Sequence, residues 1–487
     1  MEQNIQDNIL EIITSAPADR ASWVSASTFG RGVKRRAFKR AEKFLHSFIQ
    51  NPANSTWLIM PGLRGIGKTT ILSQLYDTAP ATPTRKFYVS MERISLIGGT
   101  TNDVIGAIEE IMGEQFDTVE DPVYIFLDEV QYQDDWSLAL KTVFDRTKNI
   151  FIVCTGSSAI ALQSNPDIAR RSLKLPVHPL CFTEYVMIRQ AHENAKWIDF
   201  PSSGLSRAIK EALFESKDIT QVLVRLQELR PKAAAYWRQL PTKDEYVYDY
   251  LKFGTLPFTL RDTETVVRWQ KINALLNESL ARDVDSAKSF DQDTRALFPR
   301  LLFLIANSDV ISHDKLASTL GINERTVVNM LGILTKTEIL HPIPPRGSAY
   351  KKVSRATKYL FTSPAMRAAM CTSGGVLGEE RASLLRGRLL EDAVGMYLKR
   401  LFNPSETPAI LEYDHDAAGA DFIVSQTGQK EDIVAIEVGA KKRSADQVAT
   451  TLDRTSGKYG LVVSSAGLSI DTTKNAVFIP FDIFLLL

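Results

Sequence analysis

The sequence predicts a multidomain α/β protein whose N-terminal third contains a parallel β-sheet. Four short apolar runs are rich in β-branched and aromatic residues, and segments of helical character separate them. Because continuous rather than alternating apolar runs indicate strands buried on both faces, this order predicts βαβ units. The chain of 487 residues is too long for one hydrophobic core, and about three or four domains are expected. The predicted strands are 56–61, 86–91, 123–128 and 150–155, and the predicted helices are 68–77, 101–113 and 135–148.

The composition is that of an ordinary globular protein, with 44% hydrophobic and 24% charged residues. The 58 basic and 57 acidic residues give a net charge of +1, so no global charge draws the chain to nucleic acid or to a membrane surface. No apolar stretch reaches the roughly 20 residues that cross a bilayer, and the N-terminus does not resemble a secretory signal. The three cysteines show no metal-binding spacing. We therefore expect a cytoplasmic protein without a membrane partner.

A phosphate-binding loop follows the first predicted strand. Residues 62–69 match the pattern GxxxxGK[ST] between an apolar strand and a helix. Glycines let successive backbone N–H groups point at phosphate oxygens, and the helix adds the positive end of its dipole. Lys68 would contact the β- and γ-phosphates, and the Thr69 hydroxyl would ligate Mg²⁺. The residues expected to bind ATP are Gly62, Gly65, Gly67, Lys68, Thr69 and Thr70.

An acidic half of the site follows the third predicted strand, which ends in Asp128 and Glu129. Asp128 is expected to hold Mg²⁺ together with Thr69, and Glu129 is expected to orient and polarise the attacking water. The alternative is an acidic turn after a core strand. The next strand ends near Thr155 and Ser157, where a side chain can sense the γ-phosphate. An ordinary strand-to-helix turn with a serine cap is the alternative there.

Ahead of the sheet, residues 34–49 combine helical spacing with six basic residues among the first ten. Two interpretations stay open. The helix faces phosphate or nucleic acid, or it packs on the phosphate-binding domain and leaves its charges in solvent.

Further segments occur in the order of a known family. LDEVQ (127–131), a tryptophan-containing helix, TGSS (155–158), an arginine pair (170–171) and LCFTEY (180–185) follow one another. The chain resembles prokaryotic AAA-type ATPases related to the archaeal-type and STAND ATPases. The resemblance implies ATP hydrolysis, with Arg170 or Arg171 as a cation for the transition-state charge or for a subunit contact. A plain surface arginine pair is the alternative.

The pattern and the resemblance together predict five parts. They are an N-terminal basic helical segment (1–49), a P-loop AAA-type ATPase domain (50–190), a helical lid and linker (191–295), a winged helix (296–362) and a restriction-endonuclease-like domain (380–487). Within the lid, Pro231, Pro241 and Pro257 predict breaks in the helices.

The winged-helix part contains a helix-turn-helix pattern at 316–331, with Asn323 as the expected N-cap. Few polar residues lie near the start of its second helix, so the base-reading surface is thin. A basic stretch follows and would form a wing that contacts phosphates. Contact with DNA and pure domain packing both stay open. The expected DNA contacts are Arg325, Lys351, Lys352 and Arg355, and the basic stretch also holds Arg346 and Lys358.

The C-terminal part predicts the αβββαβ order of a restriction-endonuclease-like domain. Its elements are helix 380–401, strands 409–414, 420–426 and 432–440, helix 444–453 and strand 459–464. The resemblance places Glu391, Asp421 and Glu437 at a metal site, but Gly439 stands where a lysine is expected. Because strand side chains alternate, Lys441 could supply the missing ammonium. A domain kept for structure or binding is the preferred interpretation, and nuclease activity is not expected.

These patterns predict an ATPase that uses ATP and Mg²⁺ to change the arrangement of its domains, with DNA or a DNA-bound protein as partner. Two alternatives stay open: an ATP-regulated DNase, and a STAND-like signalling switch with a protein partner. The sequence leaves the oligomeric state open.

Overall fold

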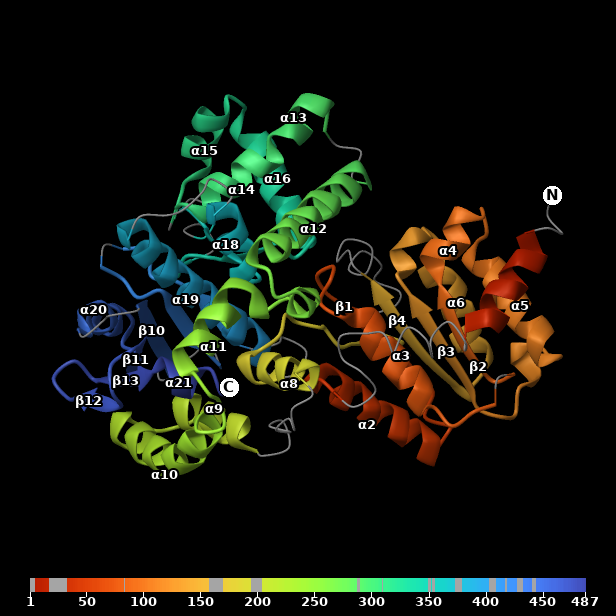
Figure 1. Ribbon diagram of the computed structural model, residues 1–487, viewed down its shortest axis with the longest axis horizontal. Helices are drawn as coiled ribbons and strands as arrows, with labels where there is room; N and C mark the ends of the chain where they lie inside the picture. The colour runs from red at the N-terminus through yellow and green to blue at the C-terminus, as the bar shows by residue number, and fades with distance from the viewer. Residues whose placement is uncertain are drawn as a thin grey trace. The chain divides into compact units, whose positions relative to one another are not determined.

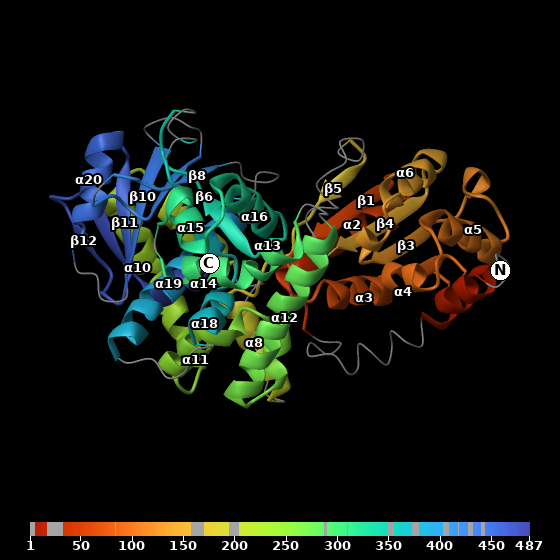
Figure 2. The same ribbon diagram turned by 90° about the horizontal axis from the view of Figure 1, so that it is seen from above.

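The computed structural model describes most of the chain, and Figure 1 and Figure 2 show its elements. The described residues are 5–16, 33–82, 84–156, 170–193, 204–286, 290–308, 310–348, 352, 355–372, 379–402, 409–416, 418–426, 432–439 and 444–487. They form two compact units. Unit 1 comprises Met1–His178 and Gln190–Lys196, and unit 2 comprises Pro179–Arg189 and Trp197–Leu487. Among the described helices, none has the length and apolarity that crossing a membrane requires.

The described part of unit 1 is built on a parallel five-stranded sheet (Figure 1). The strands lie in the order β2, β3, β4, β1, β5, so β4 separates β1 from β3. Ile59 of β1 lies opposite Cys154 of β4, and Ile125 of β3 lies opposite Ile152. The four strands predicted from the apolar runs are confirmed, and the short strand β5 is an addition. The bounds are β1 Thr56–Pro61, β2 Lys86–Ser90, β3 Val123–Asp128, β4 Ile150–Gly156 and β5 Ser172–Lys174.

Helices cover both faces of this sheet, because strand side chains alternate between the faces. On one face, Phe48 contacts the rings of Tyr124 and Phe151, and Tyr76 contacts the ring of Phe126. The helices on this face, α2 and α3, thus pack on the sheet, as the packing interpretation of the basic helix predicts. Besides the N-terminal helix 5–16, the helices of unit 1 include α2 Arg36–Gln50, α3 Lys68–Thr78, α4 Met91–Leu96, α5 Thr101–Met112 and α6 Trp136–Arg146.

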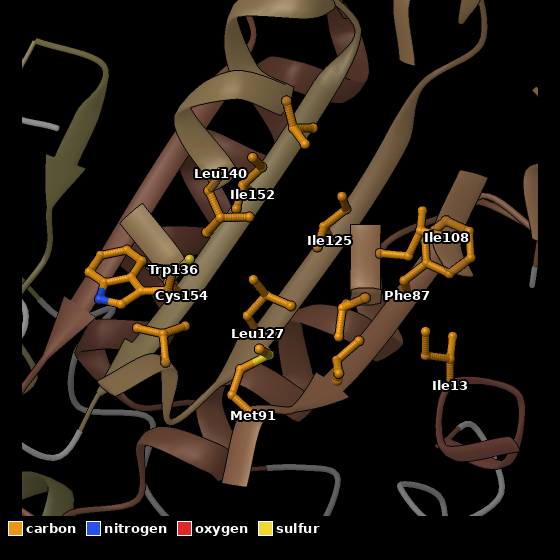
Figure 3. Packing of buried hydrophobic residues seen from close by; sticks show 14 of the residues in the cluster. Ile13, Phe87, Met91, Ile108, Ile125, Leu127, Trp136, Leu140, Ile152 and Cys154 are labelled. Atoms are coloured by element: carbon orange, nitrogen blue, oxygen red, sulfur yellow. The ribbon is translucent and has the colours of Figure 1, made fainter. Parts of the chain in front are cut away.

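The other face carries the main hydrophobic core of unit 1 (Figure 3). Apolar side chains of the four neighbouring strands β2, β3, β4 and β1 meet side chains from α5, α6 and the N-terminal helix 5–16. This core holds the strands, and therefore their carboxyl ends, in fixed register. Among its members are Ile13, Phe87, Ile108, Ile125, Trp136, Leu140 and Ile152.

The first half of unit 2 is helical. One difference from the sequence prediction is α10, which continues through Pro231. Pro231 is exposed, so water can satisfy the carbonyl group whose helical hydrogen bond the proline removes. The elements are α8 Phe182–His192, α9 Leu205–Phe214, α10 Ile219–Trp237, α11 Lys243–Asp249, a π-helical turn Tyr250–Gly254, a 3-10 helix Pro257–Arg261, α12 Thr265–Ser286 and α13 Gln292–Ala296.

Three further helices and a β-hairpin follow in the order that the sequence predicts. Helix α15 ends at Gly321, whose φ of 73° is left-handed. Helix α16 begins at Asn323, whose side chain accepts a hydrogen bond from the N–H of Thr326 at 2.8 Å, so the expected N-cap is confirmed. The bounds are α14 Phe298–Ala306, α15 His313–Leu320, α16 Glu324–Lys336, β6 Leu340–Ile343 and β7 Lys358–Phe361, and the two strands pair antiparallel.

The C-terminal residues form a six-stranded sheet within the described part of unit 2, in the order β12, β13, β11, β10, β9, β8. Strands β8, β9 and β10 are antiparallel, whereas β10, β11 and β13 run parallel. The predicted order of helix, three strands, helix and strand is confirmed, and β12, β13 and α21 are additions. The bounds are α18 Pro364–Thr372, α19 Glu379–Leu401, β8 Ile410–Glu412, β9 Phe422–Ser425, β10 Ile433–Gly439, α20 Asp446–Thr455, β11 Tyr459–Ser464, β12 Ser469–Asp471, β13 Ala476–Pro480 and α21 Phe481–Phe484.

A buried ion pair joins three helices of unit 2. Arg367 of α18 donates to the Asp392 carboxylate of α19 through Nε at 2.5 Å and Nη2 at 2.9 Å. Its Nη1 donates to the carbonyl oxygens of Ile305 and Ala306 at the end of α14, at 3.3 and 3.0 Å. Asp392 also accepts a hydrogen bond from the N–H of Phe361 in β7 at 3.0 Å. The hairpin and α19 are therefore parts of one packed body.

A close contact between β11 and α20 gives a stability prediction. A Cβ atom at Gly460 would lie 1.7 Å from Cγ1 of Val448. Because overpacking costs about 1–3 kcal/mol, Gly460→Ala should lower the free energy of unfolding by that amount, as denaturation of the full chain would measure. Gly467→Ala is the matched control, since a Cβ atom there meets nothing within 4 Å. Equal losses from the two substitutions would contradict the packing argument.

Candidate nucleotide-binding site

The loop after β1 has a shape that requires glycine. A Cβ atom at Gly62 would lie 2.4 Å from the carbonyl oxygen of Val177. Gly65 and Gly67 have φ values of 76° and 89°, a left-handed region that glycine adopts at little cost. Gly67 is also the N-cap of α3. The loop therefore wraps around the N-terminus of α3, the end of a helix that binds anions.

The Lys68 side chain lies against its own loop. It is 3% exposed, and Nζ donates to the carbonyl oxygens of Gly62 at 3.0 Å and Leu63 at 3.1 Å. It also forms an ion pair with Glu129, whose Oε1 lies 4.0 Å from Nζ. Phosphate oxygens would give this ammonium stronger, charge-assisted hydrogen bonds than neutral carbonyl groups do.

Asp128 is a buried carboxylate surrounded by hydroxyl groups. It ends β3 and is 5% exposed. The Tyr88 hydroxyl donates to Oδ2 at 2.9 Å, the Thr155 hydroxyl donates to Oδ1, and the Thr69 hydroxyl is a third hydrogen-bond partner. Burial and the charge of Glu129 raise the pKa of Asp128, and the three hydroxyl groups oppose this rise. The carboxylate and the Thr69 hydroxyl are thus brought together, as ligation of one Mg²⁺ requires.

Glu129 has a left-handed backbone, with φ 57° and ψ 52°. Such a conformation is uncommon for a residue other than glycine and clusters at functional sites. Its N–H donates to the Thr155 hydroxyl oxygen at 3.1 Å, and its carboxylate accepts a hydrogen bond from the Gln131 amide. Because Thr155 also donates to Asp128, one hydroxyl group fixes both acidic residues. The sequence places Thr155 near the γ-phosphate, and the structure adds that it orients this pair.

Three residues at this edge had no role in the sequence interpretation. Tyr88 and Gln131 contact the two carboxylates, and the signal for Gln131 was its place in LDEVQ. Arg35 is 2% exposed, and it donates to the carbonyl oxygens of Ile66 at 2.5 Å and His178 at 2.8 Å. No pattern distinguishes Arg35 from the other cations of its basic run.

Arg171 does not join this group. It directly precedes β5, whose Ser172 pairs with Trp57 near the amino end of β1, whereas the P-loop follows the carboxyl end. Its Nε donates to Oδ1 of Asp145 at 2.6 Å. The structure therefore places Arg171 in a surface ion pair at the opposite edge of the sheet from Lys68. The neighbouring Arg170 is exposed.

The cations expected in the wing pair with carboxylates of the C-terminal sheet. Arg346 Nη1 lies 3.0 Å from Oε2 of Glu412, and Lys352 Nζ lies 2.6 Å from Oε1 of the same residue. Arg355 Nη1 lies 3.5 Å from Oδ1 of Asp416. These contacts support the packing interpretation of this stretch.

Among the remaining predicted residues, Arg325 is exposed on α16. Ser157, Lys351 and Lys441 lie outside the described residues.

The carboxylates predicted for the C-terminal site are arranged around a lysine. Lys358 of β7 forms ion pairs with Glu391 of α19 and with Asp421, where Nζ and Oδ1 lie 3.0 Å apart. Glu437 is buried on β10 at 2% exposure. In the part of the chain that the structure describes, no three or more His, Cys, Asp or Glu side chains are placed to hold a metal ion. Glu391 and Asp421 are thus brought together around Lys358, and the role of these carboxylates as a metal site stays a prediction.

Comparisons with known proteins agree with the site in unit 1. Residues 54–186 match the family described as AAA domain. The T. maritima RuvB Holliday junction branch migration motor is 12% identical, with 64% of this chain and 90% of that chain covered and a TM-score of 0.29. AMPPCP-bound DnaA from Aquifex aeolicus is 15% identical, with 62% and 89% covered and a TM-score of 0.26. TM-scores this low establish no common overall structure.

A relative from Methanocaldococcus jannaschii matches along nearly the whole length of both proteins. The uncharacterized protein MJ1637 is 33% identical over 488 residues, which cover 99% of this chain and 94% of that protein. The AAA domain match spans the sheet, the phosphate-binding loop and the acidic pair of unit 1. The chain therefore belongs to the family of this archaeal protein and carries an AAA-type ATPase domain in unit 1.

Proposed function

We propose that the chain hydrolyses ATP and uses its nucleotide state to change the arrangement of its two units. The observation that carries this proposal is the position of Glu129, whose carboxylate lies 4.0 Å from the Lys68 ammonium. Its backbone is held by Thr155, which also holds Asp128. A phosphate-binding loop by itself accounts only for nucleotide binding. Glu129 adds a second, oriented carboxylate beside the loop, which can act as the base that accepts a proton from the attacking water.

Each residue has a separate task in this proposal. The glycine loop and Lys68 bind the phosphates, and Lys68 neutralises their negative charge. Thr69 and Asp128 would hold Mg²⁺, which supplies further neutralisation of the phosphate oxygens when it is bound. Glu129 orients water and accepts its proton. Because Gln131 and Lys68 contact the Glu129 carboxylate, they position this base.

Arg35 supports the part of the proposal that concerns switching. Its guanidinium links the P-loop carbonyl group of Ile66 to that of His178, and unit 2 begins at the next residue, Pro179. A movement of the loop on binding phosphates would therefore act on the segment that enters unit 2. Because the Arg35 side chain is buried and packed interiors deform little, a displacement of the P-loop would be transmitted through Arg35 to His178.

For the winged-helix-like and endonuclease-like parts of unit 2, we propose structural and binding roles without cleavage. The ion pairs of Lys352 and Arg355 with Glu412 and Asp416 favour packing of the wing over phosphate contact. Action on DNA or on a DNA-bound protein, assembly into oligomers and a cytoplasmic location stay predictions. A STAND-like switch with a protein partner is the alternative that the paired wing favours.

The two central residues should separate binding from hydrolysis. Lys68→Ala should abolish nucleotide binding, because it removes the charge that contacts the phosphates. Glu129→Gln should retain binding and lose about a hundredfold or more in hydrolysis, the usual scale for a positioned base. Fluorescent ATP binding and phosphate release measure the two steps. The exposed residue Glu120 offers a control in Glu120→Gln, and wild-type hydrolysis by Glu129→Gln would remove the role of this base.

Replacing both Lys352 and Arg355 by glutamine should leave the affinity for duplex DNA unchanged, because both cations are already paired. The double variant should lose up to about 1 kcal/mol of unfolding free energy for the partly exposed Arg355–Asp416 pair. The loss from Lys352 should be larger, because its partner Glu412 is buried. Fluorescence anisotropy of a labelled duplex at several salt concentrations gives the affinity and its salt slope. A slope reduced by about two, one for each lost phosphate contact, would instead establish the wing as a DNA contact.

Incubation of plasmid and single-stranded DNA with the wild-type chain and Mg²⁺ or Mn²⁺ should give no cleavage. The reason is that Glu391 and Asp421, the carboxylates that would have to hold the metal, already pair with the Lys358 ammonium. Asp421→Ala and Lys441→Ala serve as comparisons. Cleavage by the wild type that disappears in both variants would place the DNase alternative first.

A further inference from the structure

Lys358 is a buried cation between two carboxylates that come from different elements. It lies in β7 and is 4% exposed. Its ammonium pairs with Glu391 of α19, and Nζ lies 3.0 Å from Oδ1 of Asp421, which directly precedes β9. The sequence shows Lys358 only as the last cation of a basic stretch. In the structure it belongs to the interior of the C-terminal domain.

The surroundings of Lys358 favour a charged ammonium, because carboxylates from two different elements face it. The ring of Phe422 also faces the ammonium, with its centroid 5.4 Å from Nζ. The other oxygen of Asp421, Oδ2, accepts a hydrogen bond from the N–H of Val438 at 2.9 Å. Asp421 is thus held from both sides.

This arrangement does not fit the metal that the αβββαβ order implies. Both carboxylates already pair directly with the Lys358 ammonium, so a divalent ion would have to displace this ammonium from the oxygens that it needs as ligands. Within the described residues, no third carboxylate, histidine or cysteine lies with Glu391 and Asp421 in an arrangement that could hold a metal ion. One cation already occupies the space between the carboxylates, and it is covalently part of the chain.

We propose that the Lys358 ammonium is the resident cation of the Glu391–Asp421 pair, so that the C-terminal domain folds and functions without a divalent metal. The same ion pairs fix the β6–β7 hairpin to α19 and to the C-terminal sheet. This inference does not depend on ATP hydrolysis by unit 1.

Backbone contacts show that the hairpin and the sheet meet at this place. The N–H of Arg346 donates to the carbonyl oxygen of Tyr413 at 2.9 Å, and the N–H of Tyr413 donates to that of Pro344 at 3.1 Å. Pro345 and Tyr413 form a parallel bridge at the end of β8. Lys358 therefore acts where the hairpin is already joined to the sheet, and its charge completes the contact.

Metal binding gives the first test. The nucleotide-free full chain is titrated with Mn²⁺, and the free ion is quantified by electron paramagnetic resonance for wild type and Asp421→Asn. Binding of Mn²⁺ to unit 1 is common to both proteins and cancels. The proposal predicts that the two curves coincide. A Mn²⁺ site in the wild type that disappears in Asp421→Asn would overturn it, whatever the ATPase activity of the chain.

Thermal unfolding gives the second test. Lys358→Met keeps an unbranched side chain, one atom shorter, and removes its charge, so the midpoint of unfolding should fall because two buried carboxylates lose their partner. Lys474→Met is the matched control, since Lys474 pairs with Asp446 at 2.6 Å but is 33% exposed, and its midpoint should stay near that of the wild type.

A triple variant makes the second test specific to the cluster. Adding Glu391→Gln and Asp421→Asn to Lys358→Met removes the unpaired charges, so the triple variant should unfold at a higher temperature than Lys358→Met. If Lys358→Met does not fold, the triple variant must fold for the proposal to hold. A Lys358→Met chain as stable as the wild type, or a triple variant no more stable than the single one, would show that Lys358 is not the partner of these carboxylates.

Discussion

Both units depend on one constraint: a charge removed from water requires a partner of opposite sign or a set of hydrogen bonds. In unit 1, the Asp128 carboxylate accepts a hydrogen bond from Tyr88, a residue of the neighbouring strand. In unit 2, Arg367 pairs with Asp392 across two helices, and Lys358 pairs with carboxylates of two further elements. Because the partners come from separate segments, satisfying each charge also fixes those segments together.

The two units differ in whether their charges still have a ligand to bind. In unit 1, Lys68 donates to carbonyl oxygens and forms a 4.0 Å ion pair with Glu129, and phosphate oxygens would give it stronger hydrogen bonds. In unit 2, the Lys358 ammonium already pairs with two carboxylates that a metal would need. We therefore place the proposed chemistry in unit 1 and propose that unit 2 responds to it. Within unit 1, Arg35 contacts both the P-loop and His178, and we propose that it couples nucleotide binding to the segment that leads into unit 2.

Features that depend on residues close together in the sequence could be predicted, whereas contacts between residues far apart in the sequence could not. The strands of unit 1 follow from continuous apolar runs, and Asn323 caps α16 because its side chain reaches the third residue of its own helix. Arg35 and Lys358 each stand in a basic run, and the sequence predicts either contact with phosphates or packing of the whole segment for such a run. Their burial depends on folding against carbonyl groups or carboxylates from distant segments, which composition and spacing do not show. The place of Arg171 could not be predicted for a related reason, since the position of β5 decides which edge of the sheet it occupies.

The central claim is that the carboxyl edge of β1, β3 and β4 binds ATP with Mg²⁺. Isothermal titration calorimetry of the full chain with a non-hydrolysable ATP analogue tests it directly, in the presence of Mg²⁺ and again in the presence of a chelator. The account predicts one nucleotide bound by each chain, with weaker binding when Mg²⁺ is removed, because Asp128 and Thr69 then have no cation to hold. Absence of binding under both conditions, or an affinity that does not change when Mg²⁺ is removed, would contradict it.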